Sequence, residues 1–399
     1  MRNKKTITFS DALKASNSST AFSAMVKPVG SACNLRCTYC YYLDKEILHH
    51  RGVMSLEMLE TFIKQYIEGN TVDEVSFCWH GGEPLLAGLP FYQRALELQA
   101  KYAGGKKIIN TLQTNGTLIT DEWAQFFAAN DFLIGISIDG PQAVHQATRG
   151  NSFARAMRGV ECLQRADAQF NTLSAVSSAS AGRGVEIYRF LKSIGSRYIQ
   201  FLPVQEFKDG DLIVQPGKGA VADYSISASD WGRFNIDVFE EWVTGDVGET
   251  FVQLFDATLA NYCGVRAGIC SLNESCGDAL VVEYTGDTYS CDHFVYPEYR
   301  LGNISTDSLQ KMFRSSRQFN FGAAKHTTLH EDCVRCEFLR LCHGECPKHR
   351  DESGLSSFCE GYKMFFRFTR PYFEFMRDAL GQERPASTVI SYARSRMGI

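Results

Sequence analysis

Three cysteines stand within eight residues of the chain, in the segment "CNLRCTYC". They are Cys33, Cys37 and Cys40, and they directly follow an apolar run that predicts a strand. Three thiolates are one fewer than a four-iron cluster needs, so one iron would stay open to another ligand. An open iron allows chemistry or ligand exchange. The alternative is a structural zinc ion that takes its fourth ligand from His49 or His50.

A second group of cysteines fills the C-terminal part of the chain. A long chain in a reducing compartment uses clustered cysteines for metal or iron–sulfur centres more often than for disulfides. Zinc ribbons also contain CxxC pairs, so zinc is the competing interpretation. Cys78 and Cys162 lie in apolar patterns and are expected to be buried packing residues, whereas Cys263 has no clear role. The eight members of the group are Cys270, Cys276, Cys291, Cys333, Cys336, Cys342, Cys346 and Cys359.

The composition describes a globular protein with little affinity for nucleic acid. Of 399 residues, 44% are hydrophobic and 22% are charged, and the net charge of −4 leaves no broad basic surface for a phosphate backbone. Residues 1–20 lack the apolar core of a signal peptide and predict a flexible tail. No later stretch approaches the roughly 18 apolar residues that span a bilayer. We therefore expect a cytoplasmic protein without a membrane partner.

The elements that must position these cysteines alternate between strands and helices. Six β-rich runs are followed by turns or helical patterns, which implies a parallel sheet with helical crossovers. Such a sheet is either an open doubly wound sheet or a partial barrel, and the alternation alone does not fix its curvature. The family resemblance given below implies a partial (β/α)6 barrel followed by a small cysteine-rich iron–sulfur domain. The clearest helical patterns cover 55–69, 91–102 and 121–130. The strand runs cover 22–30, 74–82, 107–116, 132–140, 171–178 and 197–204.

The pattern changes after the sixth strand. Residues 206–229 are rich in Gly, Asp and Ser and predict a connector, and 230–243 predict a helix that Ser229 or Asp230 would cap. The segment "ALVVEYTGDTYSCD" predicts a hairpin with a Thr-Gly-Asp turn. We expect a tail over 1–20, a barrel with its connector over 21–250, and a cluster-binding domain with a C-terminal helical segment over 251–399.

The first cysteine motif resembles the signature of radical S-adenosylmethionine (SAM) enzymes. Four other segments fit the resemblance: "HGGEP" at 80–84, "QTNG" at 113–116, "SIDG" at 137–140 and Arg149. It implies that the unique iron binds the amino and carboxylate groups of SAM. Tyr39 would lie near adenine and Glu83 would bind the ammonium group, while Tyr42 would line the substrate side, although simple packing explains either tyrosine equally well. The implied cofactor-binding residues are Tyr39, Gly81, Gly82, Glu83, Asn115, Ser137 and Arg149.

The C-terminal cysteines resemble the twin-cluster SPASM domain of peptide-modifying radical SAM enzymes. In that domain eight cysteines fully ligate two [4Fe–4S] clusters, which suits electron transfer better than substrate binding. With the first motif, the resemblance implies three [4Fe–4S] clusters and SAM as cofactors. In family order, one cluster would be held by Cys270, Cys276, Cys291 and Cys346, and the other by Cys333, Cys336, Cys342 and Cys359.

From about residue 24 to 370, the chain resembles the anaerobic sulfatase-maturating enzymes. The segments "MVKPVGSACNLRCTYCYYL", "HGGEPLLAGLPFY", "CDHFVYPEYRLGNI" and "CPKHR" carry the likeness. It implies oxidation of a cysteine or serine in an unfolded sulfatase polypeptide to Cα-formylglycine, with a 5′-deoxyadenosyl radical taking a Cβ hydrogen. Asp292 would be the catalytic base, whereas a lone Asp in such a hairpin is more often a solvated turn residue. His80 departs from the Gln expected before GGEP.

Two other functions remain open at this stage. A related twin-cluster enzyme would form thioether or carbon–carbon crosslinks in a small peptide. A non-enzymatic iron–sulfur redox regulator would need a nucleic-acid-binding module, and the sequence contains no helix-turn-helix pattern or basic stripe. An enzyme of this kind also needs a low-potential electron donor such as flavodoxin or ferredoxin.

Overall fold

A computed structural model describes residues 21–42, 52–209, 212–215 and 219–399. The expected tail over 1–20 lies outside the described residues, as do His49 and His50. Among the described residues, no helix is both long and apolar enough to cross a membrane.

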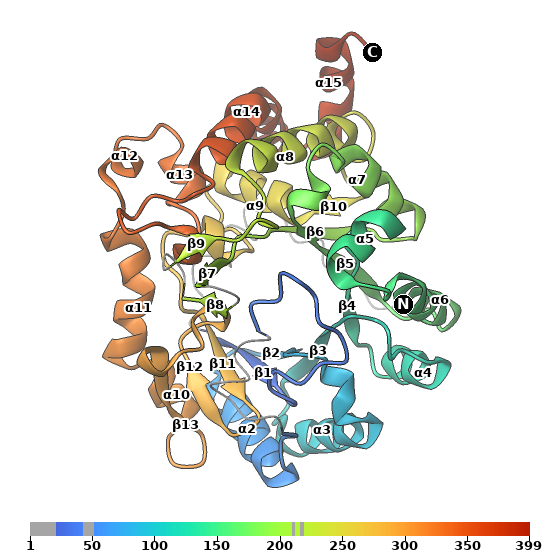
Figure 1. The fold of residues 1–399 in the computed structure, drawn as a ribbon, viewed down its shortest axis with the longest axis vertical. Coiled ribbons are helices and arrows are strands. Elements are labelled where there is room, and N and C mark those ends of the chain that lie inside the picture. Colours follow the sequence, from blue (N-terminus) through green and yellow to red (C-terminus); the bar gives the residue numbers. More distant parts are fainter. Residues whose placement is uncertain (1–20, 43–51, 210–211, 216–218) are drawn as a thin grey trace.

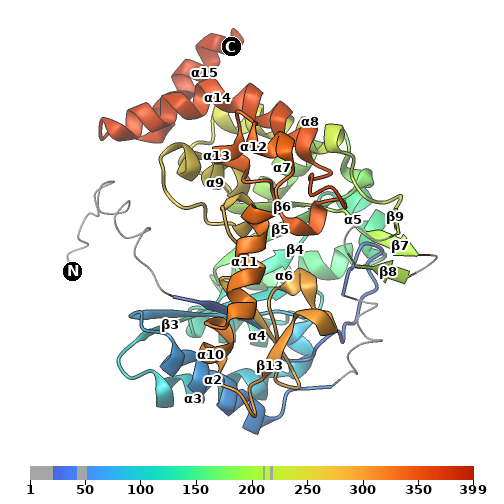
Figure 2. The ribbon, with the colours of Figure 1, turned by 90° about the vertical axis from the view of Figure 1, so that its left-hand side faces the viewer.

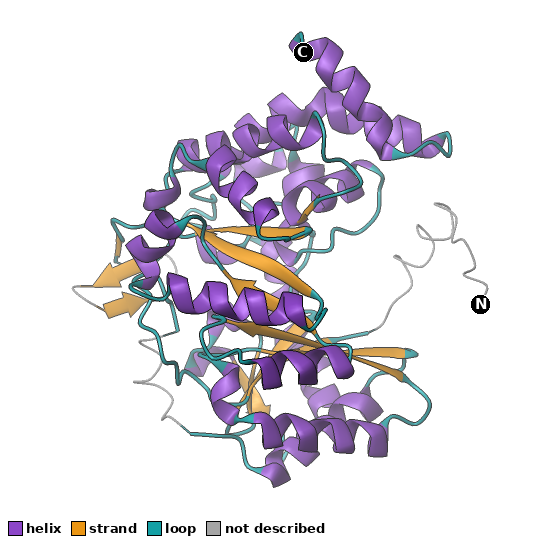
Figure 3. Ribbon diagram, turned by 90° about the vertical axis from the view of Figure 1, so that its right-hand side faces the viewer, coloured by secondary structure: helices purple, strands orange, loops and turns teal. Residues whose placement is uncertain are grey.

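All six predicted strands are present, and they form one parallel run in sequence order. This order has no switch point, so right-handed crossovers place the helices on one face of a curved sheet. Figure 3 shows helices covering the outer face of the sheet, and this arrangement is the expected partial barrel. The strands are β1 (Ser23–Lys27), β2 (Glu74–Trp79), β3 (Lys107–Thr114), β4 (Leu133–Ser137), β5 (Phe170–Val176) and β6 (Tyr198–Pro203).

The predicted crossover helices are α2 (Leu56–Gly69), α3 (Leu89–Tyr102) and α4 (Asp121–Ala129). Helix α2 illustrates why they form. Ser55 caps its N-terminus by accepting a hydrogen bond from the Met58 N–H, and Leu59, Phe62, Ile63, Tyr66 and Ile67 bury one face against the sheet at helical spacing. The remaining barrel helices are α5 (Gln142–Arg149), α6 (Phe153–Arg165) and α7 (Gly184–Ser193).

The cysteine-rich part shares this sheet. Strand β11 (Ala279–Glu283) pairs in parallel with β1, and β12 (Asp287–Tyr289) returns antiparallel to β11. The predicted hairpin is therefore confirmed, with Gly286 at φ 85° in its turn. Strand β13 (Arg300–Asn303) forms one edge of the sheet and β10 (Phe251–Val252) the other. The β1–β11 pairing places the loops after both strands side by side.

The predicted connector contains more structure than its composition indicated. Three short antiparallel strands occur in it: β7 (Phe207–Asp209), β8 (Leu212–Val214) and β9 (Ala220–Val221). The next helix is α8 (Ala228–Val243), and its cap is Ser227 rather than Ser229 or Asp230. Ser227 has extended backbone angles, and its hydroxyl accepts from the Asp230 N–H at 3.1 Å. The helix thus begins two residues earlier than its apolar pattern suggested.

Helix α14 (Cys359–Gly381) packs along α8 and begins at the last predicted cluster ligand. The two helices approach so closely that a Cβ on Gly361 would lie 2.1 Å from the Ala228 carbonyl oxygen, so this position requires glycine. Figure 2 shows α11 running between the lower part of the molecule, with α10 and β13, and the upper part, with α12 and α13. The remaining helices are α9 (Gln253–Tyr262), α10 (Leu309–Phe313), α11 (Ser316–Thr327), α12 (Glu331–Val334), α13 (Leu339–Cys342) and α15 (Val389–Met397).

Candidate active site

The loop that carries the first three cysteines leaves the carboxyl end of β1. Cys37 and Cys40 are joined by a backbone hydrogen bond from the Cys40 N–H to the Cys37 carbonyl (3.0 Å). The Thr38 N–H donates to the Thr148 carbonyl at the end of α5 (2.9 Å). The cysteine loop is therefore held at the edge of the sheet where α/β enzymes place their binding loops.

The glycine turn after β2 packs directly against this loop. The Gly82 N–H donates to the Gly30 carbonyl and the Glu83 N–H to the Ala32 carbonyl, each at 2.8 Å. A Cβ on residue 82 would lie 2.1 Å from the Ala32 oxygen, and Gly81 has a φ of 127°. Both positions thus require glycine. Gly81 and Gly82, which the resemblance implies as SAM-binding residues, make their close backbone contacts in this structure with the cysteine loop.

Glu83 is fully buried between the ends of β2 and β3. Its carboxylate accepts from the Thr114 hydroxyl (2.8 Å), the Asn115 N–H (2.8 Å) and the Leu85 N–H (3.1 Å). Burial raises the pKa of Glu83 to about 7, although these hydrogen bonds lower it. The carboxylate joins the two strand ends, a role that the sequence did not suggest.

Asn115 and Ser137 lie at the ends of the next two strands. The Asn115 amide lies 3.7 Å from the Cys33 sulfur and donates to Asn34 Oδ1 at 2.9 Å. Ser137 accepts from Gln113 Nε2 at 2.9 Å. Asn115 therefore reaches the cysteine loop, whereas Ser137 belongs to a neighbouring hydrogen-bonded pair.

Tyr39 and Arg149 meet at Asp139, a residue that sequence reasoning missed. Asp139 Oδ2 accepts from the Tyr39 hydroxyl (2.8 Å) and from Arg149 Nε (2.9 Å), and the Arg149 guanidinium lies 5.4 Å from the centroid of the Tyr39 ring. Arg149 Nη1 also approaches the Cys37 sulfur at 4.0 Å. The position of Asp139 in "SIDG", directly after a buried strand, was the available signal.

Asp292 lies against Lys27 at the carboxyl end of β1 and is not a solvated turn residue. One carboxylate oxygen forms an ion pair with the buried Lys27 at the end of β1, and the other accepts from the Tyr41 hydroxyl. Burial alone would raise the pKa of Asp292, but the charge of Lys27, the strongest opposing effect, holds it far below its usual range. The carboxylate is therefore ionised at neutral pH and can accept a proton.

Tyr42 lies behind this ion pair. Its ring is 3% exposed, its hydroxyl donates to the buried Glu283, and Lys27 Nζ lies 3.3 Å from the ring centroid. The structure thus places Tyr42 as a support for Lys27. A direct contact with substrate, as expected from the sequence, would require these contacts to change.

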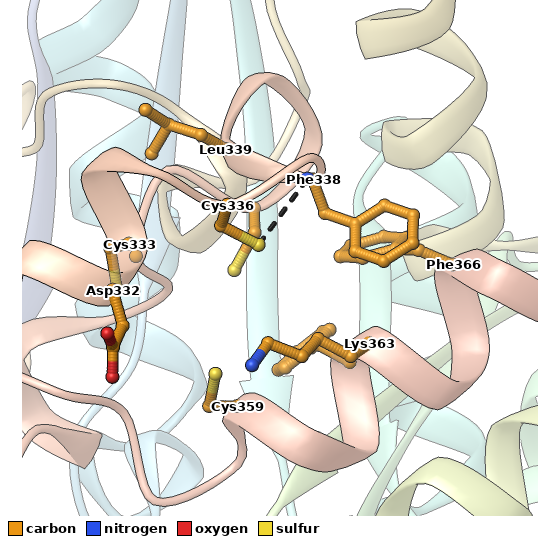
Figure 4. A pocket seen from close by; sticks show the side chains of 11 residues that line it. Asp332, Cys333, Cys336, Phe338, Leu339, Cys359, Lys363 and Phe366 are labelled. Carbon is orange, nitrogen blue, oxygen red and sulfur yellow. Dashed lines mark hydrogen bonds between the residues drawn. The ribbon is translucent and has the colours of Figure 1, made fainter.

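Four of the C-terminal cysteines line one pocket. They are Cys333, Cys336, Cys342 and Cys359, the set that family order groups together. Figure 4 shows Cys333, Cys336 and Cys359 around the pocket, with Lys363 extending its amino group into it. The Cys336 sulfur accepts from the Phe338 N–H at 3.4 Å. Cysteines converging on one pocket fit a cluster that they share.

The other four cysteines are electrostatic neighbours of one another. Burial and the nearby Cys270 raise the pKa of Cys276 to about 11, against the opposing charge of Lys325. Burial also raises the pKa values of Cys291 and Cys346, each of which has Cys270 as a charged neighbour. Lys325 Nζ donates to the carbonyls of Cys270 and Ser271, at 2.7 Å each, and secures this loop. These two groups coincide with the sets expected from the resemblance.

Comparison with known proteins supports the same interpretation. Residues 28–174 match the Radical SAM superfamily, and residues 270–337 match the iron–sulfur cluster-binding domain. A serine-type anaerobic sulfatase-maturating enzyme from Bacteroides thetaiotaomicron is 46% identical over 385 residues, which are 91% of this chain and 93% of the relative. The chain belongs to the anaerobic sulfatase-maturating enzyme family. A cysteine-type relative from Clostridium perfringens is 34% identical and covers 88% of this chain and 96% of its own.

A solved structure of this enzyme family has the same fold. The structure described as native anSMEcpe with bound AdoMet and Cp18Cys peptide aligns with a TM-score of 0.80 at 33% identity, over 90% of this chain and 99% of that chain. The present sulfatase-maturating enzyme homologue is thus a radical SAM enzyme with three [4Fe–4S] clusters and SAM as cofactors. The regulator alternative is wrong, and the zinc alternatives give way to iron–sulfur clusters.

Sequence reasoning also missed a second buried ion pair in this enzyme. Lys348 Nζ lies 2.5 Å from Glu206 Oε1, and both side chains are 7% exposed. The same Lys348 amino group lies 4.7 Å from the centroid of the Tyr41 ring. Lys348 comes two residues after Cys346, so this pair links the C-terminal cysteines to Tyr41. Lys348 lies in the segment "CPKHR", which carries part of the family likeness, but nothing in the sequence pointed to Glu206 as its partner.

Proposed function

We propose that this enzyme oxidises the side chain of one serine or cysteine in a sulfatase polypeptide to Cα-formylglycine. The placement of Asp292 carries the proposal, because Lys27 holds this ionised carboxylate at the carboxyl end of β1, directly after the proposed cluster ligand Cys291. The peptide bound to the similar anSMEcpe supports a peptide substrate. A low-potential protein such as flavodoxin or ferredoxin is the proposed electron donor.

The cofactor assignments follow the placement of the side chains. Cys33, Cys37 and Cys40 would hold the cluster that binds SAM, and the two sets of four C-terminal cysteines would hold the other two clusters. Tyr39, Asn115 and Arg149 are proposed to contact SAM, because Tyr39 is part of the cysteine loop and the other two reach the sulfurs of Cys33 and Cys37. Glu83 would order the glycine turn, and its burial supports this structural role more strongly than ammonium binding.

In this reaction the substrate side chain loses a hydrogen atom, an electron and a proton. When bound, the cofactors would supply a 5′-deoxyadenosyl radical, which takes one Cβ hydrogen atom, and clusters that accept one electron. Asp292 takes the remaining proton from the hydroxyl or thiol. Serine then yields the aldehyde directly, whereas cysteine yields a thioaldehyde that water hydrolyses to the aldehyde and hydrogen sulfide.

Two donors hold Asp292 ready for this proton transfer. Lys27 contacts one carboxylate oxygen and Tyr41 the other, so the group is fixed in orientation and kept ionised. Each carboxylate oxygen has two lone pairs. A substrate proton can therefore be accepted while both contacts persist.

The test uses two peptides that differ in one atom. One carries Ser-X-Pro-X-Arg and the other Cys-X-Pro-X-Arg, and each is incubated anaerobically with reconstituted enzyme, SAM and a strong reductant. Mass spectrometry should detect formylglycine in at least one. Cleavage of SAM with both peptides unchanged would reject a sulfatase substrate and point to another peptide, including the crosslinked peptides of related enzymes.

A further inference from the structure

His80 stands beside Lys27 where the first two strands leave the sheet. Trp79 pairs with Val26, and the His80 N–H donates to the Val26 carbonyl at 2.9 Å. Side chains alternate across a sheet, so His80 follows the face of Cys78 as Lys27 follows that of Met25. Lys27 makes the ion pair with Asp292. The imidazole of His80 is thus carried to the same end of the barrel as the proposed base.

One backbone contact fixes the tautomer of the His80 ring. The Gly81 N–H donates to Nδ1 at 2.7 Å, so this nitrogen is an acceptor and the proton of the neutral ring is on Nε2. Burial lowers the pKa of His80, and Lys27 lowers it further against the opposing effect of Asp292. The ring is therefore neutral at neutral pH. It offers one donor, Nε2–H, and no acceptor beyond Nδ1.

The donor has no acceptor in the part of the protein that the structure describes. The Gly81 N–H is the one hydrogen-bond partner of the ring among the described residues. The ring is half-buried, so it is neither sealed in the core nor fully solvated. A half-buried donor near a proton-accepting carboxylate is available to a group that arrives with the substrate.

We propose that His80 donates a hydrogen bond from Nε2 to the side-chain oxygen of the substrate and so makes serine the preferred residue. This inference rests on the proposed function, since it needs a substrate side chain at Asp292. Oxygen accepts N–H donors well, whereas sulfur is a weak acceptor. Negative charge develops on the oxygen as Asp292 removes its proton, and a fixed donor stabilises that charge. A thiol ionises near pH 8.5 and needs less help.

The test compares the two peptides across three variants. His80→Phe and His80→Met remove the donor, and His80→Gln keeps an N–H donor as the matched control. The readout is the ratio of kcat/KM for the Ser peptide to that for the Cys peptide. We expect each donor-free variant to lower this ratio about 10- to 100-fold and the Gln variant to lower it less than about 5-fold. If one donor-free variant fails to assemble its clusters, the other decides.

A binding measurement separates this role from a general structural one. With SAM bound and no reductant, the wild-type enzyme should bind the Ser peptide more tightly than a matching Ala peptide, and His80→Phe should remove most of that difference. A ratio that stays at the wild-type value in both donor-free variants would overturn the inference, as would equal losses on both peptides. Failure of the wild-type enzyme to modify either peptide would instead reject the proposed function.

Discussion

Lys27 and Asp292 form an ion pair that joins the first strand of the barrel to the cysteine-rich part of the chain. Lys27 ends the first strand of the barrel, and Asp292 follows a cysteine of the C-terminal part. Strand β11 pairs in parallel with β1, and the antiparallel return strand β12 leads on to Asp292. A single contact therefore fixes the proposed base relative to the cysteine loop that follows Lys27.

Replacing Asp292 by Asn should abolish most product formation. The amide cannot take the substrate proton, so we expect a loss of at least about 100-fold in formylglycine, with iron content and SAM cleavage retained. The measurement is mass spectrometry of the peptide beside chromatography of 5′-deoxyadenosine. Asp287→Asn in the same hairpin, which loses an ion pair with Arg300, is the control and should form product within about 2-fold of wild type. Normal product from Asp292→Asn would remove it as the base.

Removing the charge of Lys27 should shift the pH dependence of the reaction. Lys27 lowers the pKa of Asp292, so in Lys27→Met that pKa rises and the carboxylate protonates at a higher pH. Product formation should then decline on the acidic side at a higher pH than in wild type. Lys27→Arg keeps the charge and should shift the profile less. Coincident profiles for Met and wild type would contradict this account of the ion pair.

Gly82→Ala should loosen the first cluster site. The added Cβ would lie 2.1 Å from the Ala32 oxygen, a backbone atom that cannot move without the cysteine loop. We expect a destabilisation of about 1–3 kcal/mol and loss of the iron bound by that loop. Iron and sulfide analysis with a thermal unfolding scan measures both. Gly245→Ala, which has open space around its Cβ, should match wild type in each.

Cys359→Ala should remove one C-terminal cluster and leave the other. The fourth iron of this cluster would lose its cysteine and has no SAM to replace it, so iron should fall by up to one cluster's share while the first-site cluster still cleaves SAM. Electron paramagnetic resonance of the reduced protein distinguishes the clusters. Cys162→Ala and Cys263→Ala, which lie outside both sets, should keep the full iron content. Iron lost equally from every cluster would argue against independent sites.

Several features of the fold could be predicted from local sequence. Each strand of the barrel is an apolar run ended by a polar turn, and period and turn chemistry depend on neighbours in the chain. The hairpin at Gly286 and the helix after Ser55 could also be predicted from local sequence. The cap at Ser227 and the strands within the connector could not be predicted in this way. The composition there is typical of a loop, and individual hydrogen bonds decide the cap and the strand pairing.

The sequence by itself determined the chemistry available to this protein. Cysteine number and spacing indicated metal or iron–sulfur sites, and the alternation of strands and helices indicated a parallel sheet with the first cysteines at its carboxyl edge. The family resemblance implied three clusters and a partial barrel. Only the tertiary structure decided which charges face one another. Lys27 with Asp292, Glu206 with Lys348, and Asp139 with Arg149 each come from different elements. Their pairing depends on strand register and burial, and neither is encoded in any single stretch of residues.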